Sequence, residues 1–316
     1  MTLGLFVFAL GSPGQAWAAN LPTGANVTHG QVDLQQQGND ALRILQGSQS
    51  AIVNWQSFDI GAGALVDVVQ PNIDAALLSR VVGGNPSEIL GSLNANGHLF
   101  LVNPNGIIFG KDSTVDVHAL IASTLDIADS AFLSGNISFT GDSEAAVINL
   151  GSINAESFAA LIGGKVTNDG SIISPGGDAA LLAADATLEI GEAAGGKITL
   201  DLSGLLDGVA SNAGSIDVAS STTQGGSATI LGEQVSVSGS IDASGATGGG
   251  LVRIGGDYQG ANGDLANASQ ASVSGTISAD ATADGDGGRV IVWADENTEF
   301  SGSISVNGGE RSGDGG

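Results

Sequence analysis

The chain has 316 residues, 42% of them hydrophobic and only 13% charged, so it can bury a substantial core and is not a disordered acidic tail. Its 33 acidic and 8 basic residues give a formal net charge of −25, which argues against nucleic acid or anionic membrane as a direct partner because phosphate binding needs clustered Lys and Arg. The absence of cysteine excludes disulfides and thiolate metal sites.

The first expected element is an apolar run at residues 3–10, followed by Ala16-Trp17-Ala18. A short apolar run with a small-residue ending predicts a secretory signal peptide over residues 1–18, cleaved after Ala18. The usual basic n-region is missing, since no Lys or Arg precedes Arg43. A buried N-terminal strand is the alternative, and the run is too short to span a bilayer.

Two strand-like runs, LFLV at 99–102 and IIFG at 107–110, are joined by Asn103-Pro104-Asn105-Gly106. Asn at the first turn position, Pro with its preset φ at the second and a final Gly that tolerates positive φ predict a tight turn between two strands.

Other short motifs surround this turn in a definite order. They are NWQSFDIG at 54–61, RVVGGNPS at 80–87, LIASTL at 120–125 and FLSGN at 132–136. Together with the turn they resemble the N-terminal secretion domain of the filamentous haemagglutinin family, closely over residues 20–145 and more loosely through GGRVIVWAD at 287–295.

The resemblance implies two-partner secretion, in which a dedicated outer-membrane β-barrel transporter with periplasmic POTRA domains recognises the secretion domain of a large exoprotein. It implies a bacterium of Gram-negative type, export through the periplasm, and a secreted or cell-surface product. The residues that it implies for transporter recognition are Asn103, Pro104, Asn105 and Gly106, then Asn54, Trp55 and Asn136. That the turn only shapes the fold is the alternative, and the family's second asparagine-proline motif, ending in Leu, is absent.

Beyond residue 145 a phrase of the type Gly-Ser-Ile returns. It begins at Gly151, Gly170, Gly214, Gly239, Gly275 and Gly302, at offsets of 19, 44, 25, 36 and 27 residues. Most of these offsets fit one or two turns of a coil of roughly 19 to 27 residues with loop insertions, which is typical of a solenoid.

A second phrase runs in step at residues 226–230, 250–254 and 288–292, and FAALIG at 158–163 matches DAALLA at 178–183. Within such segments apolar and small polar residues alternate with period two, as in strands, so no long helix is expected. The fold class predicted is all-β, a right-handed parallel β-helix of some 13 or 14 coils at about 22 residues each, with an N-terminal cap.

The expected organisation is a signal peptide at 1–18, a secretion domain capping the β-helix at 19–145 and continuing β-helix repeats at 146–316. The sequence ends in a Gly-rich turn, so we expect a portion of a longer exoprotein; a short complete protein is the alternative.

Catalysis finds no support in the residue pattern. The basic residues are dispersed and do not meet dense acidic clusters at repeat spacing, as a polysaccharide lyase would need. The three histidines are isolated, and DATADGDGG at 280–288 is a single fragment where a calcium-binding β-roll needs tandem repeats. We therefore expect a protein that is not an enzyme and needs no cofactor or metal.

The sequence thus predicts a secreted exoprotein whose N-terminal domain addresses its transporter and whose rod presents an adhesin or filament. Host-surface carbohydrate or protein is the further partner this implies. An extracellular polysaccharide-active enzyme or a short carbohydrate-binding protein is the alternative.

Overall fold

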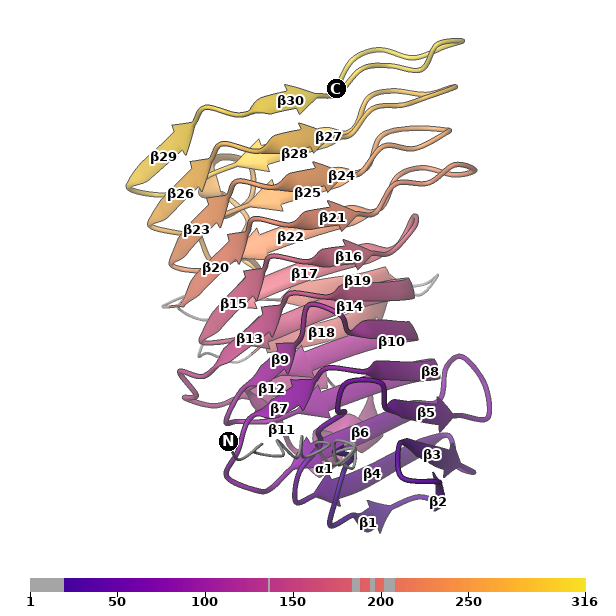
Figure 1. Ribbon diagram of the computed structural model, residues 1–316. Helices are drawn as coiled ribbons and strands as arrows, with labels where there is room; N and C mark the ends of the chain where they lie inside the picture. The colour runs from indigo at the N-terminus through magenta and orange to yellow at the C-terminus, as the bar shows by residue number, and fades with distance from the viewer. Residues whose placement is uncertain (1–19, 136, 184–187, 194–196, 202–207) are drawn as a thin grey trace, which may run out of the picture.

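The computed structural model describes residues 20–135, 137–183, 188–193, 197–201 and 208–316. The predicted signal peptide and Asn136 lie outside the described residues. The chain winds into a parallel β-helix whose strands stack in three columns (Figure 1). Along each coil it passes from column three to column one and then to column two.

Column one begins with β2 (Val32–Gln37), which lies antiparallel on the next strand. Its parallel strands are β3 (Ala41–Gln46), β5 (Leu65–Val69), β8 (Ser92–Val102), β10 (Thr114–Ser123), β14 (Ser152–Gly163), β16 (Ser171–Ile173), β21 (Ser215–Asp217), β24 (Ser240–Asp242), β27 (Thr276–Ser278) and β30 (Ser303–Ser305).

Column two begins with β1 (Asn26–His29), antiparallel to β4 (Ser50–Trp55), and continues parallel through β6 (Ala76–Val81) and the second halves of β8, β10 and β14. It ends with β17 (Asp178–Ala183), β22 (Ser227–Leu231), β25 (Leu251–Ile254) and β28 (Arg289–Val292). Column three holds β7 (Ser87–Ile89), β9 (Ile107–Phe109), β13 (Ala146–Asn149), β15 (Lys165–Asn168), β20 (Val209–Asn212), β23 (Gln234–Val237), β26 (Gln270–Val273) and β29 (Asn297–Phe300).

Strand pairing confirms the repeats that the sequence predicts. The hydroxyl residue of each Gly-Ser-Ile phrase pairs with its equivalent in the next coil, as Ser152 does with Ser171 and Ser171 with Ser215. The second phrase pairs in the same way through β22, β25 and β28, and FAALIG lies beside DAALLA in β14 and β17.

The predicted number of coils is wrong. Among the described residues column one holds ten parallel strands, from β3 to β30, which makes ten coils instead of 13 or 14. Each offset between phrases is one coil, because β16 pairs directly with β21 across the 44-residue offset and β24 with β27 across the 36-residue one. The extra residues are insertions within single coils.

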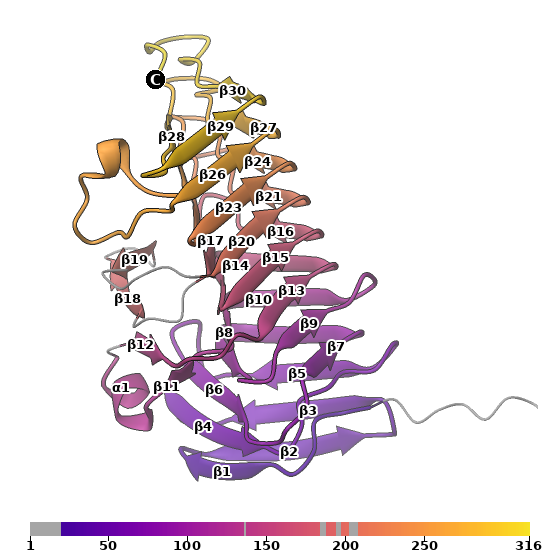
Figure 2. The same ribbon diagram turned by 90° about the vertical axis from the view of Figure 1, so that its left-hand side faces the viewer.

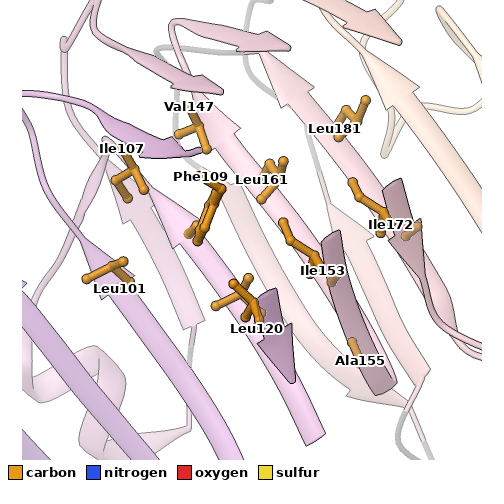
Figure 3. Close-up of a cluster of buried hydrophobic side chains, with 14 of the residues drawn as sticks. Leu101, Ile107, Phe109, Leu120, Val147, Ile153, Ala155, Leu161, Ile172 and Leu181 are labelled. Carbon is orange, nitrogen blue, oxygen red and sulfur yellow. The ribbon is translucent and has the colours of Figure 1, made fainter. Parts of the chain in front are cut away.

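The interior is filled by alternate residues of the strands in all three columns. The isoleucines of the Gly-Ser-Ile phrase stack in column one, where Ile153 and Ile172 are fully buried, and Leu161 and Leu181 stack in column two (Figure 3). Apolar side chains at the general strand spacing of about 4.8 Å thus form one continuous core along the axis.

The N-terminal end of the β-helix begins with two antiparallel strands. Only β1 and β2 run antiparallel to the coils, and parallel stacking begins at Ala41 with β3 on β5. Antiparallel strands at this end cover an edge that would otherwise expose unpaired backbone groups. The division into a capping secretion domain at 19–145 and continuing repeats at 146–316 stays a prediction; β10 pairs with β14 across residue 145.

Three insertions that carry described helical or strand segments leave the β-helix between column two and column three. The first carries β11 (Asp126–Ile127), α1 (Asp129–Ser134) and β12 (Ile137–Thr140), the second β18 (Leu188–Ala193) and β19 (Lys197–Asp201), and the third the 3₁₀ turn η1 (Tyr258–Gly260). The strands of the first two form one antiparallel sheet, and all three insertions project from the same side (Figure 2).

A second hydrophobic core lies between the outer face of column two and the first insertion. Phe100 of β8 meets Phe132 of α1 edge to face, with ring centroids 5.2 Å apart, and Phe139 is fully buried. Column two is therefore apolar on both faces, which explains why runs such as LFLV lack alternation.

Candidate functional site

The sequence motifs meet at the corner between columns two and three. Asn54 and Trp55 end β4, Arg80 lies near the end of β6, and Asn103 follows the end of β8. Because β4, β6 and β8 pair in parallel, these ends lie one above another in successive coils. We call this part of the surface the N-terminal corner.

The turn at 103–106 has the geometry that its residues predict. The Gly106 backbone N–H donates to the Asn103 carbonyl over 3.0 Å, and Gly106 has a φ of 118°. Pro104 and Asn105 are exposed, whereas Asn103 and Gly106 are buried. The turn therefore presents two side chains outward and hides two residues.

Asn103 is completely buried, and its side chain joins the turn to the preceding loop at 85–87. Its Nδ2 donates to the Asn85 carbonyl and to Ser87 Oγ, both at 3.0 Å. Its Oδ1 accepts from the backbone N–H of Asn105 at 3.0 Å and from Asn105 Nδ2 at 3.1 Å. Such a network holds the turn against the preceding loop in one conformation.

Asn105 continues the contacts of the turn into the earlier coils. Its Nδ2 donates to the Gly83 carbonyl over 2.8 Å. A Cβ at Gly83 would lie 1.9 Å from the Gln56 carbonyl oxygen, so only glycine lets these two segments touch. On the other side, Ser143 Oγ donates to the Pro104 carbonyl over 2.7 Å.

Asn54 and Trp55 have different environments although they are adjacent. Trp55 is 1% exposed and packs edge to face on Phe58, with ring centroids 5.5 Å apart. Asn54 is half-buried and accepts a long hydrogen bond of 3.4 Å from Arg80 Nη1. Trp55 is thus a core residue, and Asn54 belongs to the support of Arg80.

Arg80 ties the first insertion to the β-helix. Its Nε donates to Asp126 over 2.8 Å, its Nη1 to Asp129 over 2.7 Å, and its Nη2 to the Ile127 carbonyl, while its side chain is only 13% exposed. Burial alone lowers the pKa of Arg80, but the hydrogen bonds and charges of Asp126 and Asp129 outweigh it and raise the pKa, so the guanidinium stays charged.

The structure brings the six predicted recognition residues that it describes to this corner and separates their roles. Pro104 and Asn105 are on the surface, Asn103 and Gly106 shape the turn, and Asn54 supports Arg80. Trp55 is in the core. Arg80 was not predicted as a site residue, although a single arginine in the apolar strand ALLSRV is a signal for a buried ion pair.

No group of three or more His, Asp or Glu side chains in the described part of the chain is arranged to hold a metal ion. Among the same residues no helix is long and apolar enough to cross a membrane.

Comparison with known proteins matches this chain to the family model described as TPS secretion domain, over residues 18–223. It is 37% identical over 167 residues to a heme/hemopexin-binding protein of Haemophilus influenzae strain Rd, and 38% over 129 residues to a second Haemophilus influenzae protein of that name. These matches cover 50% and 40% of this chain but only 18% and 14% of the relatives, so the chain spans under a fifth of their length.

Two solved structures share the architecture. The HMW1 secretion domain from Haemophilus influenzae superposes with a TM-score of 0.66 at 28% identity, covering 93% of this chain and 91% of that one. The filamentous hemagglutinin secretion domain superposes with a TM-score of 0.54 at 17% identity, covering 94% and 99%, and shows likeness of fold alone.

Proposed function

Because this chain belongs to the family of TPS secretion domains, we propose that its N-terminal corner carries the address read by its outer-membrane transporter, with Pro104 and Asn105 in direct contact. Proteins with this domain are secreted by Gram-negative bacteria through an outer-membrane partner. The observation that carries the proposal is that Pro104 and Asn105 are exposed at the tip of the turn. Asn103 holds them in place, because it is buried and all its side-chain donors and acceptors are hydrogen-bonded.

A rigid turn suits recognition because little conformational entropy is lost when a partner binds it. Asn103 holds the turn from inside, and the positive φ of Gly106 allows the chain to enter β9 directly. Asn54 acts indirectly in this proposal, by accepting a hydrogen bond from Arg80. Asn136, outside the described residues, stays a predicted contact.

The proposed route begins with removal of residues 1–18 in the periplasm, where POTRA domains of the transporter receive the chain. Strand addition is the proposed docking mode, because backbone hydrogen bonds give affinity and alternate side chains give selectivity. Residues 19–145 would act as the secretion domain, and the coils of 146–316 would fold outside the cell, opposing return through the pore.

We further propose that the exported protein is not an enzyme and presents its β-helix as an adhesin or filament, with host-surface carbohydrate or protein as partner. The dispersed basic residues support this, since Arg43, Arg80, Arg253 and Arg311 each pair with a nearby carboxylate.

The test is secretion of this chain from cells with and without the cognate transporter, comparing wild type with Pro104→Ala and Asn105→Ala. Asn297→Ala is the matched control, because Asn297 is an exposed asparagine of β29, at the far end of the β-helix. We expect transporter-dependent release of wild type and control, and retention of folded Asn105→Ala in the periplasm. Release of both turn variants at the wild-type level, or release that ignores the transporter, would contradict the proposal.

A further inference from the structure

Four apolar side chains lie on the outer face of column three, in the coils next to the turn at 103–106. Successive residues of a strand point to opposite faces, so β9 and β13 each turn one isoleucine outward, Ile108 and Ile148, while their neighbours point into the core (Figure 3). Leu90 and Leu150 follow the ends of β7 and β13, and each is 39% exposed. We call Leu90, Ile108, Ile148 and Leu150 the column-three patch.

The residues of the column-three patch lie side by side. Ile108 is the direct strand partner of Ile148, and the same register places Leu150 opposite Gly110. On the other side of Gly110, a Cβ at that position would lie 2.6 Å from Cδ2 of Leu90. Because Gly110 has no side chain, the two leucines are next to each other along one edge of the two isoleucines.

Later coils fill the same positions with polar or small side chains. The residues that continue the row of Ile108 and Ile148, strand by strand, are Thr167, Ser211, Ser236 and Ser272. The residues that follow the same strands, at the position of Leu150, are Asp169, Ala213, Ser238 and Ser274. These strands pair in the same parallel register as β9 and β13. The β-helix therefore does not need apolar side chains on this outer face, and the patch needs a reason other than folding.

The column-three patch is continuous with the turn. β9 begins directly after Gly106, so Ile108 is two residues from the turn. A Cβ at Gly106 would lie 3.3 Å from the Ala146 carbonyl oxygen, and Ser143 Oγ donates to the Pro104 carbonyl over 2.7 Å, so the turn lies against the start of β13. The three insertions project beside column three and leave its outer face uncovered (Figure 2). The tip of the turn and the patch thus form one exposed surface.

We infer that the column-three patch is a second docking surface for the transporter, which covers it with an apolar face on its periplasmic side. The inference rests on the proposed function, because it extends the surface on which Pro104 and Asn105 contact the same partner. A contiguous apolar patch with a polar rim is typical of a protein interaction site. The exposed charged residues at the rim of this patch are Glu88, Lys111, Lys165 and Asp169.

The extent of the patch favours the transporter over a second copy of this chain or an external ligand. Rods that pack side by side gain most from a contact that repeats in every coil, whereas this patch ends at β13 and gives way to Thr167 in the next strand. The patch also lies within residues 18–223, the part of the chain that matches the secretion-domain family.

The test measures the Kd of the folded chain for the full-length cognate transporter in lipid nanodiscs. Ile148→Thr copies Thr167 of the next strand, so it keeps a β-branched residue and should not disturb the strand. It should weaken binding about 5-fold, and Ile108→Thr with Ile148→Thr should weaken it about 20-fold, because less apolar area is buried on docking. Leu150→Asp, which copies Asp169, is an independent variant outside the strands and should also weaken binding at least ~5-fold.

Val209→Thr is the matched control, because Val209 is an exposed apolar residue on the outer face of β20 in the same column. It should bind within about 2-fold of wild type. Far-UV circular dichroism checks that each variant is folded. Sedimentation of the chain alone and binding to nanodiscs without transporter test the other two occupants, a second copy and a lipid surface.

The inference is overturned if the folded double variant and Leu150→Asp both bind the transporter like wild type. In that case a weakened Asn105→Ala leaves the proposed function standing, whereas unchanged binding of Asn105→Ala removes both. Equal binding of wild type to empty nanodiscs, or a wild-type dimer that Ile148→Thr dissociates, also overturns the inference, because lipid or a second copy is then the occupant.

Discussion

Replacing Asn103 by Ala should destabilise the folded protein much more than replacing Asn105 by Ala. The two residues are adjacent to Pro104 in one turn, yet Asn103 is fully buried and Asn105 is exposed. Asn103→Ala removes two donated and two accepted hydrogen bonds and leaves the buried Ser87 hydroxyl without its partner.

The magnitude follows from these contacts. An unpartnered buried hydroxyl costs about 1–3 kcal/mol, and the lost contacts to the exposed Asn85 and Asn105 add about 0.5 kcal/mol each because water replaces them. The free energy of unfolding should therefore fall by about 2–4 kcal/mol in Asn103→Ala. In Asn105→Ala it should fall by about 0.5–1.5 kcal/mol, through loss of the side-chain hydrogen bonds to Gly83 and Asn103.

Urea denaturation followed by far-UV circular dichroism measures both values. Adding Ser87→Ala gives a double-mutant cycle, in which Asn103 and Ser87 should show a coupling energy of about 1 kcal/mol. If Asn103→Ala lies within about 0.5 kcal/mol of wild type, or is less destabilised than Asn105→Ala, the buried network does not hold the turn. The difference also decides how secretion data are interpreted: only Asn105→Ala tests recognition without a large loss of stability.

Three further predictions concern other parts of the fold. Arg80→Met should lower the free energy of unfolding by about 1–3 kcal/mol, because it leaves a carbonyl and two carboxylates without their donor, and hydrogen exchange should accelerate in α1 but not in β14. Asn168→Ala should lower the free energy of unfolding by about 2–3 kcal/mol, measured by urea denaturation, and by more than Asn212→Ala does. Asn168 is the middle member of a row of buried amides, since it accepts a hydrogen bond from Asn149 and donates one to Asn212. Equal losses in the two variants would contradict this arrangement. Burial raises the pKa of Asp280, but hydrogen bonds from the backbone of Asn307 and from the hydroxyls of Ser305 and Ser278 outweigh it and lower the pKa. The ionised carboxylate therefore stabilises the fold above the unfolded pKa of about 3.9, and this stabilisation is lost as the pH falls through the lower pKa of the folded state. Asp280→Asn should thus show a smaller fall in melting temperature than wild type as the pH is lowered below about 4.

The sequence alone was sufficient to predict every feature that depends on local pattern. Period-two alternation and the returning Gly-Ser-Ile phrase identified a parallel β-helix and the residue pairs of its neighbouring strands, such as Ser152 with Ser171. Asn103-Pro104-Asn105-Gly106 predicted its own turn, because φ preferences are properties of single residues.

Only the tertiary structure decided the number of coils, the exposure of the motif residues and the role of Arg80. An offset of 44 residues fits two coils or one coil with an insertion, and the choice depends on strand pairing between distant segments. Burial depends in the same way on what packs from outside: the first insertion covers column two and supplies the partners of Arg80, while Pro104 and Asn105 stay uncovered. Local preferences carry no information about such contacts, since the residues that make them are many positions apart in the chain.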